Sequence, residues 1–145
     1  MSSIDRILEP VPIPRFVTVR QHFERHSIID VYNNVRLEIR RMENLCSLKK
    51  GMRVAITVGS RGIQNLPDIV RAIIDELRAW GMLPFIIPAM GSHGGATAEG
   101  QEAVLKELGI SEESIGAPII SSMETIKIGT SSNGLPVYVD AVRSE

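Results

Sequence analysis

The stretch Arg53–Gly95, which reads RVAITVGSRGIQNLPDIVRAIIDELRAWGMLPFIIPAMGSHGG, decides the fold of this chain. Residues 53–58 and 83–88 form compact apolar runs, which are typical of strands buried in a parallel sheet. Between them, apolar residues recur at helical spacing, Pro67 favours the first turn of a helix, and Gly81 favours its end. The order of strand, helix and strand predicts a βαβ unit with two parallel strands.

Helices are predicted on both sides of this unit. Apolar positions from Ile28 to about Cys46 follow helical spacing, and so do those from about Thr97 to Leu108. Thr97 is a favourable N-cap for the later helix, and Gly109 is a favourable residue just after its end. Earlier in the chain, residues 15–20 alternate in polarity and are rich in β-branched side chains, which predicts a strand.

The C-terminal part of the sequence predicts a β-hairpin. Asn133-Gly134 is the strongest hairpin signal in the chain, and it lies between the strand-like residues 125–128 and 135–139. Residues 117–120 predict another short strand. We therefore expect an α/β fold, with a Rossmann-like parallel sheet, flanking helices and a C-terminal β-hairpin.

Domain organisation is predicted from the two ends of the sequence. Pro10, Pro12 and Pro14 predict that residues 1–14 are an extended lead-in, which leaves residues 15–145 as one α/β domain. The last residues, VYVDAVRSE, would begin a further element that nothing completes. We therefore expect the chain to be the N-terminal part of a longer two-domain protein.

Composition argues against several classes of function. The 16 basic and 17 acidic residues give a formal net charge of -1, and aromatic residues make up only 4%, so we expect no binding of nucleic acid or of a membrane surface. The single cysteine, Cys46, allows no internal disulfide, which is typical of the cytoplasm. Basic residues between Arg36 and Lys50 are interleaved with acidic ones and are expected to form a solvated helix face.

Two glycine-containing loops follow the two strands of the βαβ unit. One is Gly59-Ser60-Arg61-Gly62, and the other is Gly91-Ser92-His93-Gly94-Gly95. The carboxyl ends of parallel strands meet at one edge of a sheet, where ligands bind. We therefore expect these two loops to lie side by side at that edge.

Arg61 and Ser60 are candidate anion-binding residues in the first loop. Arginine presents a planar fork of donors that suits a carboxylate or a phosphate, and Ser60 adds a hydroxyl. Gly59 and Gly62 would allow tight turns and close approach of the backbone to a ligand. The alternative is that Arg61 pairs with a carboxylate of the same protein, for which Asp140 is a candidate.

His93 is the candidate proton donor and acceptor in the second loop. An imidazole can take or give a proton near neutral pH. The small residues around it, Ser92, Gly94 and Gly95, would leave room for a ligand beside the ring. The alternative is a loop histidine whose ring hydrogen-bonds a backbone carbonyl.

Other motifs are absent or are explained by packing. A G-x-G-x-x-G after a strand, a Walker A sequence and the paired Cys or His spacing of a zinc site are all missing. An esterase-type oxyanion loop is disfavoured because the chain has no G-x-S-x-G nucleophile elbow. Charged residues of the helix after Pro67 are expected to be solvated (Asp68, Asp75, Glu76), and three sulfur-containing residues are expected in the core (Cys46, Met90, Met123).

At these two loops the sequence resembles the nickel-dependent lactate racemase family, and most strongly its large uncharacterised branch. The resemblance is carried by TVGSRGIQNLP at 57–67, PAMGSHGGATAEGQ at 88–101 and GAPIISSMETIKIGTSSNGLPVYVDA at 116–141. It covers most of the chain from about Arg53 onward, and the string GSHGGATAEGQ is its most specific part.

The resemblance implies two α/β domains with an active cleft between them and, as cofactor, a nickel pincer nucleotide tethered to a lysine. It implies a racemase or epimerase of 2-hydroxy acids, in which a histidine moves the hydroxyl proton while hydride passes between the α-carbon and the cofactor. His93 matches that histidine. Ser60 and Arg61 match a Thr-Arg pair near the cofactor phosphate and the substrate carboxylate. The tethering lysine and the nickel-binding histidine are expected outside this chain, so none of its residues is a predicted metal ligand.

Departures from the family pattern favour a 2-hydroxy acid other than lactate, and a larger one. Val58 stands where the family has an aspartate, Gly62 where it has a proline, and Gly94 where it has an arginine. We expect the chain alone to be inactive. Two other functions remain open, namely a non-catalytic module that binds phosphate or carboxylate, and an assembly role in which a partner or another copy in a homo-oligomer covers an apolar sheet edge.

Overall fold

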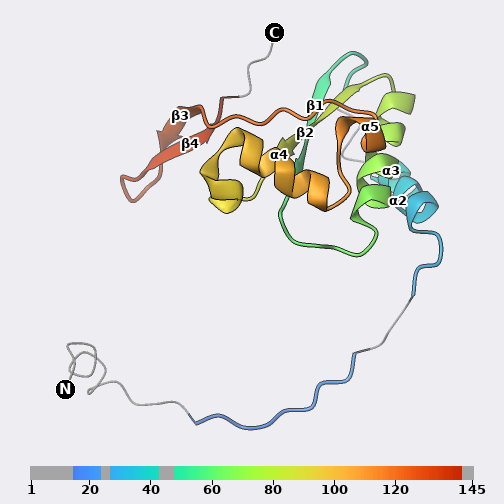
Figure 1. The fold of residues 1–145 in the computed structure, drawn as a ribbon, viewed down its shortest axis with the longest axis horizontal. Helices are drawn as coiled ribbons and strands as arrows, with labels where there is room; N and C mark the ends of the chain where they lie inside the picture. Colours follow the sequence, from blue (N-terminus) through green and yellow to red (C-terminus); the bar gives the residue numbers. More distant parts are fainter. Residues whose placement is uncertain (1–14, 24–26, 43–47, 142–145) are drawn as a thin grey trace.

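The computed structural model describes residues 15–23, 27–42 and 48–141 of the 145-residue chain (Figure 1). The α/β class is confirmed, with a parallel sheet, flanking helices and a C-terminal β-hairpin. The predicted lead-in at residues 1–14 lies outside the described part. In chain order, the elements are α2 (Val31–Arg41), β1 (Arg53–Val58), α3 (Leu66–Ala79), β2 (Leu83–Pro88), the 3-10 segment η2 (His93–Ala96), α4 (Ala98–Glu107), α5 (Glu112–Ile115), β3 (Thr125–Thr130) and β4 (Pro136–Asp140).

The parallel sheet is built on β2. It pairs with β1 along its whole length, from Arg53 opposite Leu83 to Val58 opposite Pro88, so both strands have the predicted bounds. On its other side, Ile86 forms a parallel bridge with Ile119. The predicted strand at 117–120 is therefore a single bridge, because only Ile86 exchanges backbone hydrogen bonds with it.

Side chains from β1, β2, α3 and α4 meet in one core. Ile86 and Leu105 are fully buried there, and Thr97 caps α4 as predicted by accepting a hydrogen bond from the Gly100 amide. The two strands differ in burial, because four residues of β2 are buried but only Val58 of β1 is. The buried residues of this cluster are Val58, Leu66, Val70, Ile74, Ile86, Met90, Leu105, Ile110, Ile115 and Ala117.

The helix α2 packs against α3 through polar contacts that the sequence did not predict. It ends at Arg41, and Cys46 lies outside the described residues. Glu76 was expected to be solvated, but it is 1% exposed and accepts hydrogen bonds from Arg36 and Arg40 at 2.7–3.0 Å. The predicted solvated basic face is therefore wrong for Arg36, whose side chain is 28% exposed, whereas Arg40 contacts Glu76 and still keeps its side chain 51% exposed.

Two other predictions about packing are wrong. Residues 15–20 form no strand, because no other described segment pairs with them and their side chains are exposed. Met123 is 46% exposed and lies outside the core, whereas Met90 is buried as predicted. A strand needs a partner as well as a suitable sequence, so the alternation of residues 15–20 was not sufficient.

The C-terminal hairpin is confirmed. Strands β3 and β4 are antiparallel, with Ile126 opposite Val139, and Gly134 has the positive φ of 82° that its turn requires. Nearly every residue of both strands is exposed, and in Figure 1 the hairpin lies to the left of α4. Among the described residues, no helix combines the length and the apolar character needed to cross a membrane.

Candidate functional site

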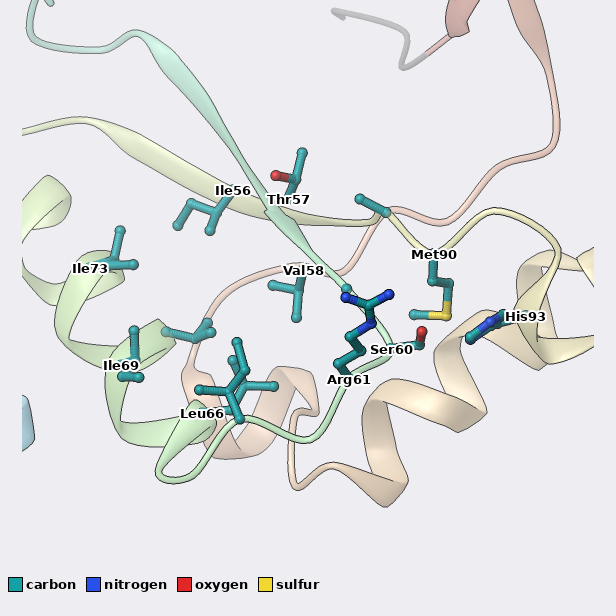
Figure 2. Close-up of a pocket in the computed structure, with 14 residues that line it drawn as sticks. Ile56, Thr57, Val58, Ser60, Arg61, Leu66, Ile69, Ile73, Met90 and His93 are labelled. Carbon is teal, nitrogen blue, oxygen red and sulfur yellow. The ribbon is translucent and has the colours of Figure 1, made fainter. Parts of the chain in front are cut away.

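The two loops after β1 and β2 lie together, as the parallel topology predicts. They line one cavity of about 530 Å³ at the carboxyl end of β1, beside α3 (Figure 2). Of the predicted site residues, Gly59, Ser60, Arg61 and His93 line this cavity. The other predicted residues, Gly62, Ser92, Gly94 and Gly95, lie in the same two loops but do not line it.

The first loop leaves β1 at Val58 and reaches α3 through a left-handed turn. The amide of Ala89 donates to the Val58 carbonyl at 2.8 Å, which joins the bases of the two loops. Asn65, the N-cap of α3, has a φ of 60°, which is uncommon for a residue other than glycine. A Cβ on Gly59 or Gly62 would make only ordinary contacts, at 3.7 and 3.9 Å. Neither glycine is therefore required by close packing against the described residues.

The Arg61 guanidinium has no protein partner in the described part of the chain. Arg61 is exposed, and no hydrogen bond or ion pair of its side chain occurs among residues 15–23, 27–42 and 48–141. The predicted alternative of pairing with Asp140 is wrong. Asp140 Oδ1 is buried without a hydrogen-bond partner, and burial raises the pKa of this carboxyl. Arg61 is therefore free to bind an anion from solution.

The second loop is braced against α4. The buried Gln101 side chain donates to the Gly91 carbonyl at 2.8 Å, and Thr97 Oγ1 donates to the Gly94 carbonyl at 3.1 Å. A Cβ on Gly94 would lie 2.5 Å from the Gln101 backbone nitrogen, so the backbones touch where only glycine fits. Four residues of the GSHGGATAEGQ string thus help to fix the shape of the loop, namely Gly91, Gly94, Thr97 and Gln101.

The backbone of this loop is left-handed just after His93, and one of the residues there is not a glycine. Gly94, Gly95 and Ala96 have φ values of 64°, 69° and 54° in succession. In the described residues, Ala96 and Asn65 are the two non-glycine positions with positive φ, and each lies in one of the loops that form the cavity. Strain of this kind concentrates at functional sites.

The His93 side chain has no hydrogen-bond partner in the part of the chain that the structure describes. Its amide donates to the Met90 carbonyl at 3.3 Å, which fixes the start of η2. Its ring lines the cavity, is exposed, and makes no hydrogen bond to any residue that the structure describes. The alternative of a ring held by a backbone carbonyl is therefore wrong for the described residues, and the ring is open to a ligand.

The polar groups of the cavity suit a small anion that also carries a proton to transfer. Among the described residues that line the cavity, Arg61 is the one with a permanent charge, and none carries a carboxylate. The hydroxyl-bearing residues Ser60 and Thr57 also line it, and the sequence reasoning missed Thr57. The position of Thr57 near the carboxyl end of β1, one residue before the buried Val58, could have indicated that it lies at the cavity. The described part of the chain holds no group of three or more side chains that could bind a metal ion.

Comparisons with protein-family models, curated proteins and solved structures find nothing that matches this chain.

Proposed function

We propose that this chain supplies one side of the active site of a racemase or epimerase that acts on a 2-hydroxy acid. Arg61 and Ser60 would bind the carboxylate of the substrate, and His93 would take the hydroxyl proton and return it. One observation carries this: Arg61 and His93 line the same cavity, and the described protein uses neither side chain for itself.

Arg61 and His93 would act on different groups of a 2-hydroxy acid, Arg61 on the carboxylate and His93 on the hydroxyl. The carboxylate accepts two parallel hydrogen bonds from a guanidinium, which fixes its orientation. The hydroxyl on the adjacent carbon then lies on the His93 side of the cavity, within reach of an imidazole that can accept its proton. Proton transfer by a positioned side chain accelerates a reaction about 10²–10⁴-fold. Oxidation of the α-carbon needs a hydride acceptor in addition, because no side chain can serve as one.

A nickel pincer nucleotide, implied by the sequence resemblance, would supply that hydride acceptor when bound. Arg61 and Ser60 fit an anionic group such as its phosphate. His93 is the one imidazole among the described residues that line the cavity, and none of those residues is a lysine. The proposal therefore assigns the tether and the nickel ligand to residues outside this chain.

A second candidate is a module that binds a carboxylate or phosphate without chemistry. It is favoured by the unpaired Arg61, which needs only an anion as its partner. The two candidates differ in the role of His93, which is essential to the first and incidental to the second.

Turnover measurements separate the candidates in a longer protein that contains this chain together with the tethering lysine and the nickel ligand, and that has been loaded with nickel pincer nucleotide. Racemisation of a single enantiomer of a 2-hydroxy acid is followed by chiral chromatography for the wild type and His93→Asn. We expect the variant to lose at least about 100-fold in turnover while it still binds the acid. Equal turnover in both would refute the role of His93, and binding without turnover in either would favour the module.

A further inference from the structure

We infer that the cavity prefers a monocarboxylate with a branched apolar side chain over lactate and over dicarboxylates. This inference rests on the proposed function, because it takes the carboxylate to be bound by Arg61. It concerns the apolar part of the cavity, which neither Arg61 nor His93 lines.

An apolar wall occupies that part of the cavity. Ile69 and Ile73 are one helical turn apart on α3, and both are half-buried, as is Ile56 of β1. Ile63, in the loop before α3, is 60% exposed and extends the same wall. These side chains therefore keep apolar surface in contact with water, which a ligand could cover.

Arg61 lies at the border of this wall. In Figure 2 its side chain stands between the labelled α3 side chains on one side and Met90 and His93 on the other. A carboxylate bound to Arg61 can therefore direct its hydroxyl toward His93 and its carbon chain toward Ile69 and Ile73. The cavity of about 530 Å³ is within the range of sites that hold drug-sized ligands, so it leaves room beyond a three-carbon acid.

The charges of the described lining disfavour a second anionic group. Besides Arg61, this lining holds no other arginine and no lysine, so a second carboxylate directed toward the isoleucines would have no cationic side chain beside it. Burying an unpaired carboxylate is strongly unfavourable. Each buried methylene instead strengthens binding by about fourfold.

Isothermal titration of the full chain with lactate, 2-hydroxy-4-methylpentanoate and malate tests this preference. We expect 2-hydroxy-4-methylpentanoate to bind at least about tenfold more tightly than lactate, and malate to bind no better than lactate. Ile73→Ser should remove most of that preference, measured as the ratio of the affinities for 2-hydroxy-4-methylpentanoate and lactate. Ile29→Ser, at a position 99% exposed and outside the cavity, is the matched control and should leave the preference unchanged.

The outcomes separate this inference from the proposed function. If all three acids bind with equal affinity and Arg61→Gln abolishes binding, the carboxylate site stands and the apolar preference is wrong. If no acid binds, or binding is independent of Arg61, the proposed function and this inference both fail. The comparison among acids uses the wild-type chain, so it decides the question even if Ile73→Ser does not fold.

Discussion

Gln101 of α4 donates from Nε2 to the carbonyl oxygen of Gly91 at 2.8 Å, across ten residues of chain. Gln101 is 5% exposed, so its polar amide is buried, and the Gly91 carbonyl is the hydrogen-bond partner that compensates for this burial. The bond fixes the point at which the chain leaves β2, and with it the place of His93 at the cavity. The loop is thus held in shape before any ligand arrives, which lowers the cost of binding.

Gln101→Ala should loosen this loop. Loss of a buried hydrogen bond costs about 1 kcal/mol of unfolding free energy, and the Gly91 carbonyl would have to find water. We expect a lower urea midpoint and broadened amide resonances for Ser92 and His93. The neighbouring exposed Glu102→Ala is the control, and an equal effect of both changes would contradict the brace.

Gly94→Ala should damage the fold far more than Gly95→Ala. Both glycines have positive φ, so each change costs about 1–2 kcal/mol in backbone conformation alone. A Cβ on Gly95 meets open space, but one on Gly94 would lie 2.5 Å from the Gln101 nitrogen. We expect Gly94→Ala to cost at least about 2 kcal/mol more in unfolding free energy, measured by urea denaturation. Equal costs would mean that α4 does not contact the loop as described.

Glu76→Ala should weaken the junction of α2 and α3. Glu76 is almost fully buried and accepts hydrogen bonds from Arg36 and Arg40, so its removal leaves both arginines unpaired at this surface. We expect a loss of about 1–3 kcal/mol in unfolding free energy. Glu38→Ala, which removes an exposed pair with Arg41, should change little. A loss no greater than that of Glu38→Ala would contradict the buried contact.

The same contact predicts a pH dependence. Hydrogen bonds from Arg40, and then from Arg36, hold the pKa of Glu76 below its usual value in spite of its burial. A carboxyl with a depressed folded pKa contributes stability that is present above its unfolded pKa, near 4.3, and is lost as pH falls toward the folded value. Thermal melting of wild type and Glu76→Gln should therefore converge below about pH 4.3. A constant difference in melting temperature between pH 7 and pH 3 would contradict this.

The sequence predicted the framework of the site because that framework is local. The apolar runs of β1 and β2, Pro67 and the Thr97 cap are signals that lie inside the elements they define. The meeting of Arg61 with His93 required only that the two strands be parallel and adjacent, which the intervening helix dictated.

Features that depend on distant partners could not be predicted. Residues 15–20 have a strand-like sequence but pair with nothing in the described chain. The sequence of α3 alone predicts that Glu76 is a surface charge, because its two arginine partners lie on α2, about 40 residues earlier in the chain. The positive φ of Ala96 has no signal in its own residue type, because alanine rarely adopts this conformation.

The measurement closest to the central claim compares an acid with and without its hydroxyl. Binding of 2-hydroxy-4-methylpentanoate and of 4-methylpentanoate is measured by titration calorimetry for the wild type, Arg61→Gln and His93→Ala. We predict that Arg61→Gln weakens both acids at least about tenfold. His93→Ala should weaken only the hydroxy acid, by about three- to tenfold, because the ring bonds the hydroxyl alone. If His93→Ala affects both acids equally or neither of them, then Arg61 and His93 do not form one site for a 2-hydroxy acid.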